Sequence, residues 1–202
     1  DLFSVMLDKR MIYTCGYWSK EVSTLEGSQK AKLDLVARKL DLKPGMKVLD
    51  IGCGWGGAAK YFSETYGVSV IGITISKEQV SYANEQCEGL DVDIRLLDYR
   101  ELDEQFDAIY SIGMFEAVGY KNYRQYFEVV HHCLKKEGVF LLHTIGVDQS
   151  TTSTDPWIEK YIFPNGMMPS SKQIAGAIEG LFKIDDWHNF GSDYDKTIMC
   201  WY

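Results

Sequence analysis

A glycine-rich stretch is the first part of the sequence whose residues could bind a ligand. The run Asp50-Ile51-Gly52-Cys53-Gly54-Trp55-Gly56-Gly57 follows a short apolar segment and precedes a segment with helical periodicity. Glycines between a strand and a helix let the backbone turn tightly and approach a ligand closely. The stretch therefore indicates a site for a nucleoside-bearing ligand.

The spacing of this turn leaves two cofactors open. Gly52, Gly54 and Gly57 satisfy the dinucleotide fingerprint, which fits a nicotinamide cofactor as well as S-adenosylmethionine. Asp50 favours S-adenosylmethionine, because a carboxylate before the turn would repel a pyrophosphate and attract an ammonium and a sulfonium. The acidic residue that often binds the ribose is replaced by Thr74-Ile75-Ser76, where Gln79 could substitute. A turn without any ligand is the third interpretation.

Other reactive side chains allow both a functional and a structural interpretation. Glu116 follows an apolar run, where an unpaired carboxylate is costly, so it indicates either a functional group or an ion pair. His143 ends an apolar run and fits a ligand site or a hydrogen-bonded core histidine. Cys15 taken alone suits a small buried apolar residue. The neighbours His131 and His132 would point apart on a helix, which favours a solvated face over a metal site.

The elements that would position these residues alternate along the chain. Strands are expected over 48–51, 68–73, 93–97, 106–112 and 139–144, with helices between them. Capping sequences at Ser23–Glu26, Ser76–Gln79 and Ser170–Gln173 predict three helix starts. This alternation predicts an α/β fold with a doubly wound, mostly parallel sheet covered on both faces.

The end of the chain departs from this regular pattern. Residues 149–155 are polar and predict a surface loop, and 182–190 are expected to form a sixth strand. The chain then stops one element later, at Tyr202. We therefore expect that the final strand of such a sheet is missing from this chain.

Composition bounds the class of protein. A chain of 202 residues with 46% hydrophobic content suits one domain. The net charge of −8 argues against nucleic acid and against attraction to an anionic membrane. Five cysteines without a C-x-x-C pair fit a reducing cytosol, and no apolar run is long enough to span a bilayer.

Several longer motifs carry a more specific signal than the glycine turn. Over Leu2 to Tyr202 the chain resembles the cyclopropane-fatty-acyl-phospholipid synthases and the related mycolic acid cyclopropane synthases. The motifs are Tyr13-Thr14-Cys15-Gly16-Tyr17-Trp18, Gly72-Ile73-Thr74-Ile75-Ser76, Gly113-Met114-Phe115-Glu116-Ala117-Val118-Gly119, Leu142-His143-Thr144-Ile145-Gly146, Tyr161-Ile162-Phe163-Pro164-Asn165-Gly166 and Trp187-His188-Asn189-Phe190-Gly191-Ser192-Asp193-Tyr194.

This resemblance implies a class I methyltransferase fold, S-adenosylmethionine as methyl donor and a bicarbonate ion as base. It implies bicarbonate ligands at Cys15, Glu116, His143, Ile145 (through its backbone) and Tyr194. It implies cofactor contacts at Tyr13, Thr14, Asp50, Gly52, Gly54, Gly56, Thr74, Ile75, Gln79, Tyr99 and Arg100, with Asp98 as a candidate for the adenine amino group. It implies no metal.

The expected reaction joins a methylene group to a cis double bond of a phospholipid acyl chain. We expect a cytoplasmic enzyme with peripheral contact to the inner membrane face, and a homodimer is compatible with the sequence. The chain departs from the family in Ala117, which replaces a usual histidine, and is expected to lack the N-terminal lipid-binding domain and the C-terminal end. A methyltransferase of a small molecule and a non-catalytic lipid- or cofactor-binding relative are the alternatives.

Overall fold

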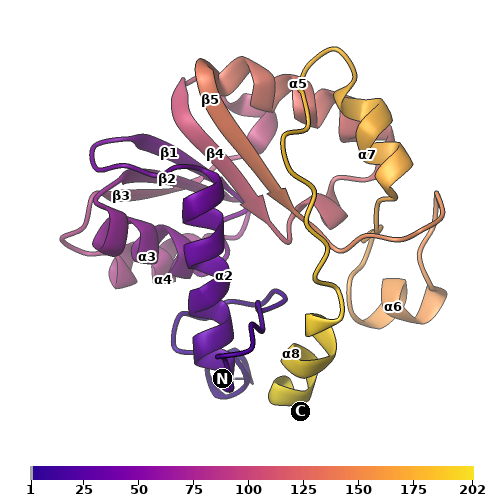
Figure 1. Cartoon of the computed structure of the whole chain (residues 1–202), viewed down its shortest axis with the longest axis horizontal. Coiled ribbons are helices and arrows are strands. Elements are labelled where there is room, and N and C mark those ends of the chain that lie inside the picture. Colours follow the sequence, from indigo (N-terminus) through magenta and orange to yellow (C-terminus); the bar gives the residue numbers. More distant parts are fainter. Residues whose placement is uncertain (1) are drawn as a thin grey trace.

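Five parallel strands form one sheet in the computed structural model, which describes residues 2–202. Their order is β3-β2-β1-β4-β5, so the chain crosses over between β3 and β4 from one side of β1 to the other (Figure 1). The strands are β1 (Lys47–Ile51), β2 (Ser69–Thr74), β3 (Val92–Leu96), β4 (Phe106–Ile112) and β5 (Leu134–His143). All five carboxyl ends therefore meet at one edge of the sheet.

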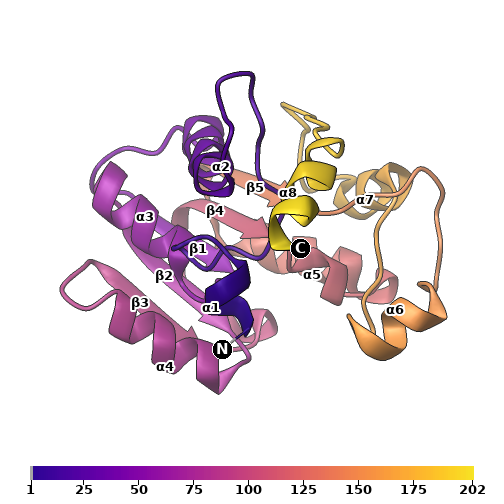
Figure 2. The same cartoon turned by 90° about the horizontal axis from the view of Figure 1, so that it is seen from below.

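Helices connect the strands and flank the sheet. They are α1 (Leu2–Met6), α2 (Leu25–Lys39), α3 (Gly57–Tyr66), α4 (Lys77–Gln86), α5 (Tyr123–Cys133), α6 (Pro156–Tyr161), α7 (Ser171–Ile178) and α8 (Asp193–Trp201), with short 3-10 turns at Tyr99–Glu101, Phe115–Ala117 and Tyr120–Asn122. Figure 2 shows α2, α3 and α4 on one side of the sheet and α5 and α7 on the other. The predicted double covering is confirmed.

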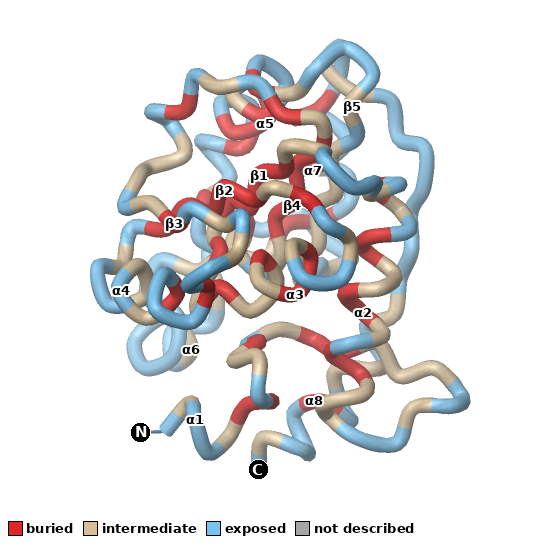
Figure 3. Tube along the Cα trace, turned by 90° about the vertical axis from the view of Figure 1, so that its left-hand side faces the viewer, coloured by how far each residue is buried: buried red, intermediate tan, exposed pale blue. Residues whose placement is uncertain are grey.

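Alternating strand residues separate the core into two halves. Leu49 and Ile51 pack with α5 and α7 residues in one cluster, whereas Val48 and Tyr110 pack with α2 and α3 residues in the other. This follows from the two-residue period of a strand, which directs successive side chains to opposite faces. Buried residues accordingly concentrate along β1, β2 and β4, in the middle of the sheet (Figure 3). The loops that follow β1, β2 and β4 therefore extend from the buried centre of the sheet.

Local signals predicted most element ends to within about two residues of their observed positions. Ser76 and Ser170 cap α4 and α7 as predicted, and Ser170 forms a complete capping box with Gln173. The first cap differs: Thr24, not Ser23, accepts the amide of Gly27, because the helix begins one residue later than expected. Strand β5 also begins earlier than residue 139, with a register shift against β4.

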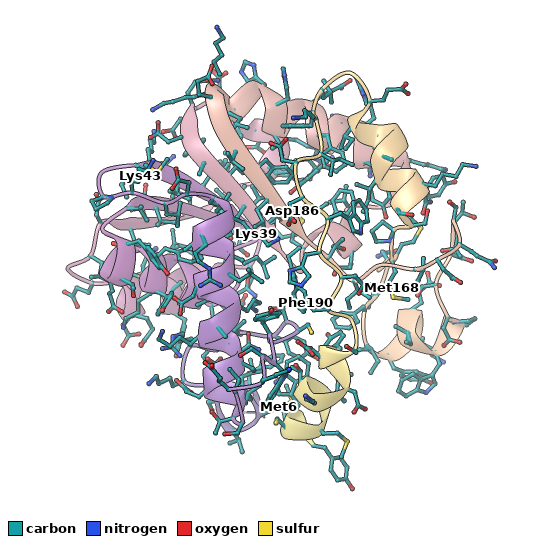
Figure 4. All side chains as sticks on the ribbon, viewed as in Figure 1. Met6, Lys39, Lys43, Met168, Asp186 and Phe190 are labelled. Atoms are coloured by element: carbon teal, nitrogen blue, oxygen red, sulfur yellow. The ribbon has the colours of Figure 1, made fainter. Side chains whose placement is uncertain are left out.

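The predicted sixth strand over 182–190 is wrong, because these residues form no strand and pair with no edge of the sheet. The segment carries Lys183, Asp185 and Asp186, whose exposed charges suit solvent better than a buried strand. Asp186 instead forms an ion pair with Lys39 on α2, and the two side chains meet in front of the sheet (Figure 4). Phe190, farther along, packs on the ring of His143, with ring centroids 5.4 Å apart. The segment thus runs as a strap from α7 to α8.

Candidate functional site

The glycine turn after β1 is shaped partly by packing and partly by open space. Gly52, Gly54 and Gly56 all have positive φ values, of 83°, 54° and 82°. A Cβ atom on Gly52 would lie 2.5 Å from the side chain of Met114, and one on Gly56 would lie 2.7 Å from that of Ala83. A Cβ atom on Gly54 would meet nothing within 4 Å. Gly54 is therefore the glycine that leaves backbone accessible to a ligand.

Asp50 lies at the buried base of this turn. Its carboxylate is 2% exposed and accepts a hydrogen bond of 2.8 Å from the hydroxyl of Tyr110. Burial raises the pKa of Asp50 to about 7, although the Tyr110 hydrogen bond opposes this shift. The structure thus gives Asp50 a protein partner, and its contact with a cofactor stays a prediction.

The residues after β2 form a second part of the same edge. The hydroxyl of Thr74 donates to Oε1 of Gln79 at 2.5 Å and accepts from the amide of Ser76 at 3.2 Å. The next residue, Ile75, is 80% exposed although it is apolar. An exposed apolar side chain beside a fixed polar pair suits a ligand with an aromatic base and a sugar.

Asp98, Tyr99 and Arg100 follow β3 along this edge. Asp98 caps the 3-10 turn by accepting the amide of Arg100 at 2.9 Å, and Arg100 Nη2 returns to Asp98 Oδ2 at 2.6 Å. The guanidinium lowers the pKa of Asp98. Because this ion pair is exposed, its net contribution to stability is small. Breaking the pair so that either side chain binds a ligand therefore costs little.

Glu116 and Ile145 connect the ends of β4 and β5. The amide of Ile145 donates to Oε1 of Glu116 at 2.7 Å, whereas Oε2 of Glu116 is buried and has no hydrogen-bond partner among the described residues. Burial raises the pKa of Glu116. Ala117, next to it, is exposed. The structure therefore brings together two predicted site residues and leaves one carboxylate oxygen free to bind a further group.

His143 is the last residue of β5, two residues before Ile145. Its Nδ1 atom is buried and also lacks a hydrogen-bond partner among residues 2–202. Burial, with a smaller contribution from the charge of Lys32, lowers the pKa of His143 to about 3. The ring is thus neutral at physiological pH and can donate or accept one hydrogen bond.

Cys15 lies in the segment between α1 and α2, which crosses the carboxyl edge of the sheet. Its thiol is buried, and burial raises its pKa to about 11, so it is protonated at neutral pH. Thr14 precedes it and is half-buried, and Tyr13 packs on Trp201 of α8 with ring centroids 5.0 Å apart.

Helix α8 binds this segment through one buried hydroxyl. Thr197 Oγ1 accepts from the amide of Gly16 and from the indole of Trp18, both at 3.0 Å, and donates to the carbonyl of Asp193. Asp193 Oδ2 in turn accepts the amide of Trp18 at 2.7 Å. We call these contacts the Thr197 clasp. It joins residues that are far apart in the sequence, and both the N-terminal segment and α8 lie below the sheet in Figure 1.

The Thr197 clasp holds α8, which carries Tyr194, against the segment that carries Cys15. Burial raises the pKa of Tyr194 to about 12, and Cys15, Tyr13 and Glu116 add to this shift through their charges. The ring of Tyr194 packs edge-on against Trp201, which packs in turn on Tyr13, with ring centroids 6.0 Å and 5.0 Å apart. Thr14 adjoins Gly113 after β4, whose amide donates to the carbonyl of His143 at 3.0 Å. The N-terminal segment, the ends of β4 and β5 and α8 are therefore linked by contacts, and a common pocket for all five predicted ligands stays a prediction.

Two residues of this region escaped sequence reasoning, Lys32 and Thr197. Lys32 is fully buried on α2, and its ammonium donates to Thr14 Oγ1 at 2.6 Å. A signal was present, because Lys32 lies four residues before Val36 and so shares the buried face of the helix. Thr197 had no such signal, since no periodic pattern near the end of the chain predicted α8.

No helix within residues 2–202 is long and apolar enough to cross a membrane. No group of three or more His, Cys, Asp or Glu side chains in this range has the arrangement of a metal site.

Comparison with known proteins assigns the chain to a family. Residues 1–202 match the profile of the mycolic acid cyclopropane synthetase family. The cyclopropane-fatty-acyl-phospholipid synthase of Escherichia coli (strain K12) is 60% identical over all 202 residues, which cover 53% of that protein. The S-adenosylmethionine-dependent methyltransferase UmaA of Mycobacterium tuberculosis is 36% identical and is covered to 77% of its length by the whole chain.

Solved structures of the same family have the same fold. Mycolic acid cyclopropane synthase CmaA1 complexed with SAH and CTAB has a TM-score of 0.92 at 32% identity, with 100% of this chain and 77% of that chain covered. The fold is therefore the Rossmann-like fold of S-adenosylmethionine-dependent methyltransferases. The chain belongs to the mycolic acid cyclopropane synthetase family, and it spans about half the length of the Escherichia coli relative.

Proposed function

We propose that this chain is the catalytic part of an enzyme that transfers a methylene group from S-adenosylmethionine to a cis double bond of a phospholipid acyl chain, with bicarbonate as base. The supporting observation is the pair of unpartnered, buried polar atoms at neighbouring strand ends, Glu116 Oε2 and His143 Nδ1. Buried polar atoms normally have partners, so this pair suits a small polar ligand. The 60% identity to the phospholipid enzyme supports the substrate class.

The glycine turn fits S-adenosylmethionine. Gly54 leaves open space over the backbone, and the exposed Ile75 and the Thr74–Gln79 pair lie at the end of the adjacent strand. These residues would hold the adenosyl moiety, while Tyr13 and Thr14 would close over it from the N-terminal segment. When bound, the cofactor supplies an electrophilic methyl group on a sulfonium.

The anion region fits bicarbonate. Ring closure requires a proton to leave the newly added methyl group, and bicarbonate can accept that proton. Cys15 and Tyr194 are neutral donors there because burial raises both pKa values. His143 is neutral as well, and its unpartnered Nδ1 can orient the anion through a hydrogen bond. Glu116, whose pKa is raised, can share a proton with the bound anion. The chain's own residues thus bind and orient the base without becoming nucleophiles for the methyl group.

We also propose that the enzyme works in the cytoplasm, at the inner face of the membrane. The region of α6 exposes Trp157, Tyr161, Ile162 and Phe163, with Lys160 over the ring of Tyr161 at 5.0 Å. Aromatic side chains next to a lysine suit the interface between lipid and water. The wild type should float with vesicles of zwitterionic phosphatidylcholine, and loss of flotation in Trp157→Ser would support this contact, whereas unchanged flotation would contradict it.

Mass spectrometry of lipids tests the reaction directly. Phospholipids from cells that express the protein should gain one methylene per cis double bond, and cells expressing Glu116→Gln should not show this gain. A product methylated on a small molecule, with unchanged lipids, would instead support a small-molecule methyltransferase. Binding of SAH without any turnover would support a non-catalytic relative.

A further inference from the structure

Lys32 is a lysine whose side chain is removed from solvent. It projects from α2 with 0% exposure, beside the core residues Leu33 and Val36. Burying an ammonium is costly unless the charge is paired or serves a function. Its surroundings therefore call for an explanation.

The ammonium group contacts the segment that carries Cys15. Lys32 Nζ donates to Thr14 Oγ1 at 2.6 Å, and Gln29, one turn earlier on α2, donates its amide to the Thr14 carbonyl at 2.8 Å. On the opposite side, a Cβ atom built on Gly113 would lie 2.3 Å from Cγ2 of Thr14. Thr14 is thus held by α2 through both polar groups and by the loop after β4 through its methyl group.

The positive charge of Lys32 has no carboxylate in ion-pair contact among the described residues, although the charge of the buried Asp8 raises the pKa of Lys32 more than that of Cys15 does. The ion pairs of the described residues include none for Lys32, and the buried carboxylate of Asp8 pairs with Arg10, at 3.7 Å. Burial raises the pKa of Cys15 and lowers that of His143, and the charge of Lys32 opposes the first shift and adds to the second. These are two of the residues that surround the predicted anion. The geometry agrees: Thr14, which binds Lys32, adjoins Cys15 in the chain and packs on Gly113, whose amide donates to the carbonyl of His143 at 3.0 Å.

We propose that Lys32 is a positioning residue that fixes Thr14 and Cys15 and supplies the buried positive charge required by an anion bound between Cys15 and His143. The inference rests on the proposed function, because it assigns a partner to the bicarbonate of that reaction. It also explains how neutral donors can retain an anion away from water. Hydrogen bonds from a thiol and a phenol alone would leave a full negative charge in an apolar setting.

The test compares Lys32→Met with Lys30→Met. Methionine keeps the length and the apolar stem of lysine without the charge, and Lys30 lies on the same helix, exposed and paired with Asp34. Two properties are measured: stabilisation of the cofactor-free protein by added bicarbonate in thermal unfolding, and ring formation as a function of bicarbonate concentration. In Lys32→Met, the bicarbonate concentration that gives half of the maximal stabilisation, or half of the maximal rate of ring formation, should rise at least about tenfold. A rise of this size is expected for the loss of one internal charge interaction. Lys30→Met should match the wild type, and affinity for SAH should change far less in both.

A pH series separates charge from structural support. Burial lowers the pKa of Lys32 to about 7, while Asp8 and Cys15 raise it, and His143 and Asp193 are the other titratable groups facing this pocket. Stabilisation of the wild type by bicarbonate should therefore weaken as the pH rises through about 7. The ionisation of bicarbonate itself affects both proteins equally, so it cancels in the ratio of the bicarbonate stabilisation of the wild type to that of Lys32→Met. A ratio that does not change with pH would overturn the assignment of the positive charge to Lys32.

Three outcomes have distinct meanings. If the wild type neither forms rings nor responds to bicarbonate, the proposed function fails. If the wild type does both and Lys32→Met has the same bicarbonate dependence, the inference about Lys32 is wrong. Should Lys32→Met fail to fold, Thr14→Val and Thr14→Ser decide, because only serine keeps the hydroxyl that binds Lys32. Equal bicarbonate responses of these two variants would refute the positioning role.

Discussion

The amide of Ile145 donates a hydrogen bond of 2.7 Å to Oε1 of Glu116, and this bond joins the loops that follow β4 and β5. It uses one carboxylate oxygen and directs the other into a buried space. Because the bond needs only an acceptor, a neutral amide at residue 116 can replace that part of Glu116. The structural and the chemical contributions of the residue can therefore be separated.

Glu116→Gln should keep the fold and lose the reaction. Glutamine retains an acceptor for Ile145 but cannot share a proton with a bound anion, so ring formation should fall at least about a hundredfold. Affinity for SAH should stay nearly unchanged, since the glycine turn is untouched. Gas chromatography of acyl chains and titration calorimetry measure the two properties. Full activity of Glu116→Gln would remove this residue from the mechanism.

Gly54→Val should abolish cofactor binding. The branched side chain would occupy the open space over the turn and would also strain a residue with φ of 54°. Gly89→Val is the matched control, because Gly89 has φ of 81° and equally open surroundings but lies in the turn before β3. Both variants should lose about 1–2 kcal/mol of stability, and only Gly54→Val should lose SAH in calorimetry. Equal SAH affinity of the two would place the cofactor elsewhere.

Thr197→Val should weaken the attachment of α8. The substitution keeps the shape of the side chain but leaves the buried amide of Gly16 and the indole of Trp18 without their acceptor. We expect a loss of about 1–3 kcal/mol in the free energy of unfolding, measured with urea. Thr152→Val in the exposed 149–155 loop should cost almost nothing. A wild-type urea midpoint for Thr197→Val would show that these bonds do not stabilise the fold.

His143 should make the protein sensitive to acid. Its folded pKa of about 3 lies below the unfolded value of 6.5, so the unfolded chain alone takes up this proton as the pH falls from 6.5 towards 3. Stability is thus lost over that window, by up to a few kcal/mol. Asp50 acts oppositely between about 4 and 7, since its folded pKa is raised. The difference between wild type and His143→Gln cancels Asp50 and should show a steeper acid loss in the wild type; parallel urea midpoints across this window would contradict it.

Local sequence signals were sufficient for the sheet and the strand-end residues. Strand β4 was predicted with its observed bounds, because Phe106, Ile109, Tyr110 and Ile112 have high β propensity and the segment stands between a polar turn and a glycine. The sites after β1, β4 and β5 followed from the rule that parallel strands end at one edge. These features depend only on neighbours in the chain.

Long-range contacts were beyond such reasoning. The segment 182–190 has an apolar residue at each end, but its position is set by the ion pair of Asp186 with Lys39 and by the contact of Phe190 with His143. Neither contact leaves a periodic signal. The same holds for Thr197, whose partners lie about 180 residues earlier. Tyr194 was found through the family resemblance and not through its own spacing.

The Thr197 clasp has a consequence for the timing of the catalytic cycle. Cys15 lies on one side of the clasp, next to Gly16, and Tyr194 lies on the other, next to Asp193. Separation of α8 from the N-terminal segment would therefore withdraw two walls of the pocket in a single motion. Under the proposed function, exchange of the base with solvent and entry of a long acyl chain would then share one gate, and their rates would rise and fall together.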